Sequence, residues 1–374
     1  MKIAFVSEDK LNDVSVWSGT TSNIYDVISK RNEVVSVRPS GIKLFCGKVI
    51  RKFTKWFKLP DLEAFSDEWI AKVEGKSLSQ KLKSHSDVDF IFVAAEDNLI
   101  EFLHTDIPIV FLNDATFNEM INYYWFHLTK KQINIHTRMD QTTLDKSALI
   151  LMASEWAKND AVQTYGINES KVKVLPFGAN LPDQFVPHQL EADDKVKLLF
   201  VGVEWERKGM DVICSMMDKL NEKYPHQFEI NAIGLNGLDD QKFPDNIKFH
   251  GFVSKHTDAG LGKMIKIYNE SDIFVLPTKA ECAGIAFAEA SEYGLPSITY
   301  DTGGIGTYVI NDYSGYRLNR SATAMDFADT VSDLANDHEK LVKMSKNARR
   351  LYKTKLNWDA WEHGFNKLTH KFDN

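Results

Sequence analysis

The sequence has few cysteines, no long hydrophobic run and no excess of basic residues. Its three cysteines, Cys46, Cys214 and Cys282, are far apart, which argues against a disulfide framework or a cysteine-based zinc site and fits a reducing compartment. No window approaches ~20 consecutive apolar residues, so no transmembrane helix is expected. Lys and Arg number 45 against 52 Asp and Glu, a net charge of −7, so general electrostatic binding of nucleic acid is not expected.

The remaining composition is that of a globular protein. Of the 374 residues, 43% are apolar and 26% are charged, which excludes intrinsic disorder and suggests two or three domains. The first residues, MKIAFVSED, contain an apolar run that is too short for a signal peptide and is better explained as a buried first strand. We therefore expect a cytoplasmic protein.

Short apolar runs alternate with longer amphipathic stretches along the whole chain, which predicts an α/β fold with parallel sheets. The segment GANLPDQFVPHQLEADD contains Gly, two Pro and an acidic cluster and separates two such series. We therefore expect an N-terminal domain over 1–178, a linker over 179–194, a C-terminal domain over 195–355 and a terminal helix within 356–374. The runs expected to form strands are Lys2–Val6, Val34–Val37, Phe90–Ala94, Ile107–Leu112, Ala148–Met152, Lys173–Leu175, Lys197–Val201, Phe228–Ile233, Ile247–His250, Ile273–Leu276 and Ser297–Tyr300.

The most informative segment is IFVLPTKAECAGIAFAEASEYGLPSITYDTGGI, which begins at Ile273. A buried strand is expected to end near Leu276, a loop to carry Glu281, and a helix that begins near Gly284 to carry Glu289. The first N–H groups of that helix, next to the small residues Ala283 and Gly284, would suit a phosphate. An ordinary strand–loop–helix unit with solvated glutamates explains the spacing equally well.

This segment resembles the signature of the family-4 retaining glycosyltransferases, in which two glutamates are separated by seven residues and are followed by G-x-P and a Gly-Gly turn. Here those residues are Glu281, Glu289, Gly294, Pro296 and Gly303-Gly304. The resemblance implies the GT-B fold, in which two Rossmann-like domains face each other across a cleft. It places Glu281 beside the transferred sugar and Glu289 on the ribose of the donor, with Ala283, Gly284 and Ile285 also at the donor.

A second informative segment, LFVGVEWERKGMD, begins at Leu199. It contains the adjacent basic residues Arg207 and Lys208 at an expected helix start. Such residues are usually solvated, but a lysine near the cleft can neutralise a leaving diphosphate. The resemblance assigns that role to Lys208, with Arg207 assisting. Many family members carry an arginine where this chain has Val203, which weakens the assignment of Arg207.

Three further positions follow from the resemblance. Gly19 lies in a loop that the family places over the donor phosphates, where backbone N–H groups can bind a diphosphate. Asp114 follows an expected strand and would contact distal hydroxyls of the sugar, although Asp-Ala-Thr could equally cap a helix. Val253 falls in the segment whose backbone meets the nucleobase.

No metal or cofactor is expected. Asp87-Val88-Asp89 has the spelling of a metal-binding DxD but leads directly into a strand, and the histidines show no ligand spacing. His136 is expected to be structural or to lie on the acceptor side. GT-B enzymes generally stabilise the leaving diphosphate with basic residues and helix N-termini instead.

The resemblance therefore implies transfer of a hexose from a UDP- or GDP-linked donor to a glycan or lipid-linked acceptor with retention at the anomeric carbon, as in polysaccharide biosynthesis. Two alternatives remain. The chain could be a catalytically silent sugar-nucleotide-binding partner of another glycosyltransferase, or a GT-B sugar-nucleotide epimerase. Both motif glutamates and the lysine are present, which favours the transferase.

The segment 41–58, GIKLFCGKVIRKFTKWFK, combines six basic residues with apolar residues at helical spacing. Such a helix could lie on an anionic membrane surface, which would favour a lipid-linked acceptor at the inner face of the membrane. Alternatively, its apolar face packs on the N-terminal sheet and its lysines are merely solvated.

Overall fold

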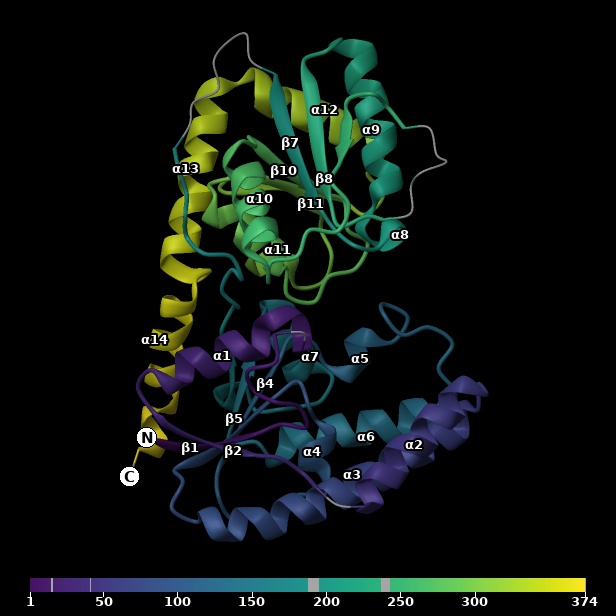
Figure 1. Cartoon of the computed structure of the whole chain (residues 1–374), viewed down its shortest axis with the longest axis vertical. Coiled ribbons are helices and arrows are strands. Elements are labelled where there is room, and N and C mark those ends of the chain that lie inside the picture. Colours follow the sequence, from purple (N-terminus) through teal and green to yellow (C-terminus); the bar gives the residue numbers. More distant parts are fainter. Residues whose placement is uncertain (15, 41, 188–194, 237–242, 374) are drawn as a thin grey trace. The chain divides into compact units, whose positions relative to one another are not determined.

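The computed structural model describes residues 1–14, 16–40, 42–187, 195–236 and 243–373. The chain divides into two compact units (Figure 1). The N-terminal unit comprises Met1–Leu175 together with Glu362–Asn374, and the C-terminal unit comprises Pro176–Trp361. Residues 188–194 of the linker expected at 179–194 lie outside the described residues.

The N-terminal unit is built on six parallel strands in the order β2-β1-β3-β4-β5-β6. Every side chain of β3 and β5 is buried, as expected for a parallel sheet that helices cover on both faces. The chain moves outward from β1 to β2 and returns to the other side of β1 with β3. The carboxyl ends of β1 and β3 therefore form a topological switch point, where open α/β sheets bind ligands. The strands are β1 (Lys2–Val6), β2 (Glu33–Val37), β3 (Phe90–Ala94), β4 (Ile109–Asn113), β5 (Leu149–Met152) and β6 (Val172–Val174).

Local sequence signals start several helices of this unit. Thr116 and Thr129 are N-caps in capping boxes with Glu119 and Gln132, and Pro60 occupies a first-turn position that tolerates its missing N–H. The helices are α1 (Thr20–Ser29), α2 (Ile42–Trp56), α3 (Pro60–Leu82), α4 (Asn98–Glu101), α5 (Phe117–Met120), α6 (Lys130–Lys146) and α7 (Glu155–Gln163).

Helix α2 packs on α3 through a narrow strip rather than through its apolar face. Gly47 and Thr54 are buried, and a Cβ at Gly47 would lie 2.5 Å from the ring of Trp69. By contrast, Phe45 and Trp56 are 70% and 78% exposed. The alternative in which the apolar face packs on the sheet is therefore wrong, because Phe45 and Trp56 of that face are exposed and the buried positions of α2 are the small residues.

The C-terminal unit has a second sheet of six parallel strands in the order β12-β11-β10-β7-β8-β9. Here the chain runs outward from β7 through β9 and returns beside β7 with β10, so the switch point lies between the carboxyl ends of β7 and β10. The strands are β7 (Val196–Val201), β8 (Phe228–Ile233), β9 (Ile247–Phe249), β10 (Ile273–Leu276), β11 (Ser297–Tyr300) and β12 (Gly315–Leu318). The helices are α8 (Trp205–Lys208), α9 (Met210–Lys223), α10 (Asp258–Asn269), α11 (Ile285–Glu292), α12 (Ala324–Asn336) and α13 (His338–Lys355).

The predicted α/β class is confirmed, and the predicted strands coincide with β1 to β11 within two residues at each end. Strand β12 was not predicted. It is a four-residue edge strand of sequence GYRL in which only Gly315 is buried, so it carries no apolar run.

Helix α14 (Trp358–Thr369) begins in the C-terminal unit and ends in the N-terminal unit. Its residue Phe365 is fully buried in the N-terminal unit, with ring centroids 6.1 Å from Phe90 and 5.5 Å from Phe92. Arg31 forms an ion pair with Glu362 at 2.6 Å. The last residues of the chain therefore complete the core of the unit in which the chain begins.

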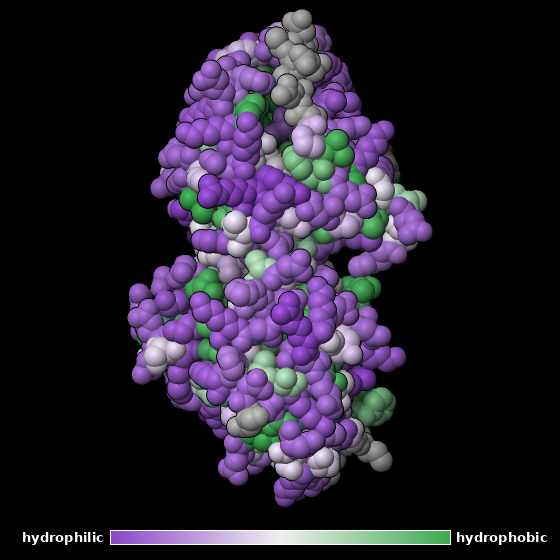
Figure 2. All heavy atoms as spheres, turned by 90° about the vertical axis from the view of Figure 1, so that its left-hand side faces the viewer, coloured by the Kyte–Doolittle hydropathy of each residue, from purple (hydrophilic) through white to green (hydrophobic). Residues whose placement is uncertain are grey.

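No helix among the described residues is long and apolar enough to cross a membrane. The face shown in Figure 2 is mostly hydrophilic, with apolar residues in small separate patches.

We predict that Phe365→Ala destabilises the N-terminal unit by about 3–5 kcal/mol, because it leaves a cavity between α14 and β3. Urea unfolding followed by tryptophan fluorescence and circular dichroism measures the change. Lys367→Ala, on the exposed side of the same helix, is the control and should leave the midpoint nearly unchanged. Equal midpoints for the two variants would contradict this account.

Candidate functional site

The switch point of the C-terminal sheet brings two predicted residues together. Strands β7 and β10 pair in parallel, with Leu198 opposite Ile273, so the segments that follow them start at one edge of the sheet. Lys208 lies on the segment after β7 and Glu281 on the segment after β10. Their side chains form an ion pair between the Lys208 Nζ and a Glu281 carboxylate oxygen. Both side chains are largely buried.

Glycine makes this approach feasible. Gly209 follows Lys208 with a φ of 78°, a left-handed conformation that favours glycine. A Cβ on Gly209 would lie 2.1 Å from the carbonyl oxygen of Pro277, closer than any side chain permits. Lys208 is therefore the last residue of the short α8 and precedes α9, whereas the sequence predicted a position at a helix start.

Arg207 is engaged inside the unit. Its guanidinium forms two hydrogen bonds with the Glu204 carboxylate, at 2.5 and 3.0 Å, and donates to the carbonyl of Ala280 at 3.1 Å. Its own carbonyl accepts from the N–H of Lys279 at 2.7 Å. These contacts fix the loop that carries Glu281, so Arg207 helps to position Glu281.

Glu289 forms a second lysine–carboxylate pair. It lies on α11, its side chain is 2% exposed, and it contacts the Nζ of Lys255. Tyr268 donates a hydrogen bond to its other oxygen at 3.3 Å. Burial, followed by the nearby charge of Glu289, raises the pKa of the Tyr268 phenol far above its usual value, so this group remains a donor. Lys255 was not singled out by the sequence analysis. The available signal was that Lys255 lies two residues after Val253, in the segment expected to meet the nucleobase.

Helix α11 begins after Gly284, whose φ is 67°, next to Ala283 and Ile285. The first turn of α11 contains no acidic residue. This suits the binding of an anion at the positive end of the helix. The N–H of Gly304, in the Gly-Gly turn, donates to the carbonyl of Glu281 at 3.0 Å. The two parts of the sequence signature are therefore in direct contact.

The segment containing Val253 follows β9 and is held by backbone contacts. Gly251 has a φ of 66°, and its carbonyl accepts from the N–H of Gly234 at 2.8 Å. The N–H of Phe252 donates to the Asn236 side chain at 2.9 Å. Val253 itself is half-buried.

Two predicted residues belong to the N-terminal unit. Gly19 has a φ of 86° and precedes α1, where a left-handed residue is needed. Asp114 follows β4 and lines a cavity of 380 Å³ that also contains His136. Asp114 is not the helix cap, since the N-cap of α5 is Thr116. A larger cavity of 580 Å³ lies at the opposite edge, beside Asp89 and Pro108, and contains none of the predicted residues.

The DxD-like acids bind the start of the chain. Asp89 accepts a hydrogen bond from the backbone N–H of Lys2 at 2.7 Å, and Asp87 pairs with the Lys2 Nζ at 2.6 Å. Within the described ranges, no group of three or more His, Cys, Asp or Glu side chains is arranged to hold a metal ion.

The chain is similar to known proteins in sequence and in fold. Residues 183–351 match the family of glycosyl transferases group 1. A D-inositol 3-phosphate glycosyltransferase of Corynebacterium jeikeium is 23% identical over 61% of this chain and 58% of its own length. The chain thus spans less than two thirds of the length of such curated relatives.

Solved structures align over nearly the whole chain. Sucrose-phosphate synthase of Thermosynechococcus elongatus has a TM-score of 0.67 at 14% identity and covers 99% of this chain and 98% of its own. HepE of Anabaena, in complex with UDP and glucose, has a TM-score of 0.64 at 12% identity and covers 99% and 100%. Together with the two parallel sheets, these alignments show that the chain has the two-domain GT-B fold.

We predict that Lys255→Met lowers the stability of the C-terminal unit by about 1–3 kcal/mol, because the buried Glu289 carboxylate loses its cation. The double variant Lys255→Met/Glu289→Gln should recover part of that loss. Lys266→Met, which removes the exposed pair with Glu270 on α10, is the control and should change little. Thermal and urea unfolding measure all three, and a double variant no more stable than Lys255→Met would contradict the pairing.

Proposed function

We propose that this protein is a retaining glycosyltransferase that transfers a hexose from a nucleotide diphosphate sugar, UDP- or GDP-linked, to a hydroxyl of a glycan or lipid-linked acceptor. The observation that carries the proposal is the buried pair of Lys208 and Glu281 at the switch point between β7 and β10. A pre-formed lysine–carboxylate pair there offers a cation for a leaving diphosphate and an acceptor for sugar hydroxyls within one contact distance.

In the proposed reaction, the bond between the anomeric carbon and the diphosphate breaks, and its electron pair leaves with the diphosphate oxygen. The acceptor hydroxyl forms the new bond to the same face of that carbon and gives its proton to the departing diphosphate oxygen. Lys208 moves from Glu281 to the diphosphate and neutralises the charge that develops there. Glu281 then accepts hydrogen bonds from the sugar.

The nucleotide would be bound by the neighbouring groups. Glu289, held by Lys255 and Tyr268, would accept the ribose hydroxyls, and the backbone near Val253 would meet the base. The N-terminus of α11, at Gly284 and Ile285, would share the diphosphate charge with Lys208. HepE, which has this fold, is described in complex with UDP and glucose, and this supports the assignment of the ligand class.

No metal has a step in this proposal. Stabilisation of the diphosphate comes from one lysine and a helix terminus of the C-terminal unit.

We predict that Glu281→Ala and Lys208→Ala each lower kcat by about 10²-fold or more, since charge stabilisation of this kind contributes about 3–4 kcal/mol to the transition state. Transfer is measured with UDP- and GDP-hexoses and glycan acceptors, and the anomeric configuration of the product by NMR. Thermal-shift measurements with the same donors identify the base, because a ligand at about 100 times its dissociation constant stabilises by about 2.7 kcal/mol.

The matched control is Lys219→Ala, which removes an exposed pair on α9. Wild-type turnover in both folded site variants would overturn the proposal. Donor binding without hydrolysis or transfer would instead indicate a silent partner protein, and an epimerised donor would indicate an epimerase.

We propose in addition that α2 places the protein on an anionic membrane surface, where a lipid-linked acceptor would be found. Its exposed stripe carries Phe45, Val49, Phe53 and Trp56, and Lys52 and Lys55 are exposed beside it. Aromatic side chains with adjacent lysines are the composition of an interfacial helix. Each basic residue near an anionic surface contributes roughly 1 kcal/mol.

We predict that Lys52→Glu/Lys55→Glu weakens binding to phosphatidylserine-containing vesicles more than tenfold at low salt, and that Phe53→Ser/Trp56→Ser does so at any salt. Co-sedimentation measures the bound fraction. These residues are chosen because Lys48 pairs with Glu8 and Arg51 lines the cavity, so reversing them would also disturb the unit itself. Lys76→Glu/Lys130→Glu is the charge-matched control, and equal pelleting of all variants would exclude membrane contact through α2.

A further inference from the structure

Helix α2 is held on the N-terminal unit by few apolar contacts. Of its residues 45–56, only Gly47 and Thr54 are buried. Gly47 packs on α3, where a Cβ at this position would lie 2.7 Å from the Ile70 side chain. Elements that bury little apolar surface open before the rest of a domain does. The polar contacts of α2 therefore decide how firmly this helix is docked.

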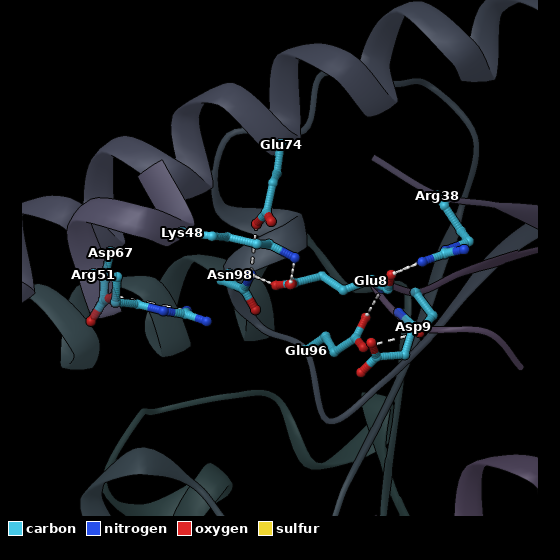
Figure 3. Close-up of polar contacts among 10 residues, drawn as sticks. Glu8, Asp9, Arg38, Lys48, Arg51, Asp67, Glu74, Glu96 and Asn98 are labelled. Atoms are coloured by element: carbon cyan, nitrogen blue, oxygen red, sulfur yellow. Dashed lines mark hydrogen bonds and ion pairs between the residues drawn. The ribbon is translucent and has the colours of Figure 1, made fainter. Parts of the chain in front are cut away.

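Those polar contacts converge on Glu8, the second residue after β1 (Figure 3). The Lys48 Nζ pairs with one oxygen of the Glu8 carboxylate at 2.6 Å, and the Asn98 amide donates to the other oxygen at 2.9 Å. The same amide donates to Glu74 of α3 at 2.7 Å. Glu74 lies one turn after Ile70, so the two side chains share the face of α3 on which α2 packs. One lysine and one amide thus serve two carboxyl groups.

The groups around Glu74 supply too few donors for two ionised carboxyl groups. Glu74 is wholly buried, and one of its oxygens accepts no hydrogen bond within the described part of the chain. Two carboxyl groups that share a buried site cannot both ionise without a large cost. Burial, followed by the charge of Glu8, raises the pKa of Glu74 to about 8. For Glu8, burial is outweighed by the hydrogen bond and charge of Lys48, and the pKa is lowered. Glu74 therefore carries a proton while Glu8 is ionised.

Other charged groups on the elements packed around α3 have partners of their own. Glu96, after β3, accepts a hydrogen bond from the N–H of Glu8 at 2.9 Å, and Arg38, after β2, donates to the Glu8 carbonyl at 2.7 and 3.0 Å. The remaining pairs are Arg51 with Asp67 at 3.9 Å, His136 with Asp67 at 3.5 Å and Arg138 with Glu101 at 2.8 Å. Lys48 is thus the cation that contacts the Glu8–Glu74 pair. If both carboxyl groups ionised, two negative charges would face one positive charge in a site closed to water.

We propose that the docking of α2 is coupled to one proton, which the Glu8–Glu74 pair holds while α2 is in place and releases to solvent when α2 moves away. An undocked α2 exposes both carboxyl groups to water, where a glutamate ionises near about pH 4.3. Between that pH and about 8, the docked state binds one proton more than the undocked state. Docking therefore weakens as the pH rises across this range, by up to about tenfold per pH unit, and levels off above it. Helix α2 is held most firmly in acid.

Hydrogen exchange of the full chain, measured by mass spectrometry on peptides from α2, tests the coupling. After correction for the intrinsic pH dependence of exchange, we expect the protection of α2 in the wild type to fall at least about tenfold between pH 5.5 and 7.5. Glu74→Gln keeps the shape of the protonated side chain and can donate to Glu8 at every pH. In this variant the protection of α2 should therefore stay constant.

The matched control is Glu119→Gln. Burial raises the pKa of Glu119 to about 8 as well, but this residue belongs to α5 and accepts a hydrogen bond from the N–H of Thr116. The protection of α2 should therefore fall with pH in this variant as it does in the wild type.

Three results would overturn the proposal. The first is an α2 whose protection is constant in the wild type, or absent already at pH 5.5. The second is an equal fall in Glu74→Gln, or the loss of the fall in Glu119→Gln, because the titrating group would then lie elsewhere. The third is a fall of the same size in peptides from β1 and β3, which would mean that the whole unit opens rather than α2.

Discussion

The parallel pairing of β7 with β10 is the constraint on which the site of the C-terminal unit depends. Because these strands are neighbours, the segments that carry Lys208 and Glu281 start at the same edge of the sheet, although the two residues are 73 positions apart in the sequence. Gly209 then permits backbone contact with Pro277 that no side chain would allow, and the ion pair of Lys208 with Glu281 follows. Arg207 stabilises the same loop through Ala280. Removing that pairing would separate every group to which we assign a role in diphosphate departure.

Both motif glutamates are held by lysines before any ligand is present. A buried carboxylate without a cation is costly, so Lys208 and Lys255 stabilise the fold as well as offering charge to a ligand. In the proposed reaction Lys208 exchanges the Glu281 carboxylate for the diphosphate, while Lys255 stays with Glu289, which accepts the ribose hydroxyls.

Helix α2 of the N-terminal unit carries basic residues on two sides. Lys52 and Lys55 are exposed on α2 beside aromatic side chains, whereas Lys48 and Arg51 of the same helix turn toward Glu8 and Asp67. Helix α2 therefore presents two lysines to solvent and two basic side chains to carboxyl groups inside the unit. One helix thus contributes both to the surface that we assign to a membrane and to the lining of the cavity.

The sequence by itself determined the α/β class, because buried parallel strands require continuous apolar runs. Through its resemblance to a known family it also singled out Glu281 and Glu289 in a spaced motif and Lys208 in a second segment. It did not identify Lys255, although that residue lies two positions after Val253. It could not identify the contacts of Arg207 with Glu204 and Ala280 or the edge strand β12, since neither has a local signature. Whether the apolar residues of α2 were buried also depended on tertiary packing, because periodicity defines a face but not what covers it. Only the folded chain decided that Gly47 and Thr54 make the contact, and that five carboxyl groups from distant segments share one cavity.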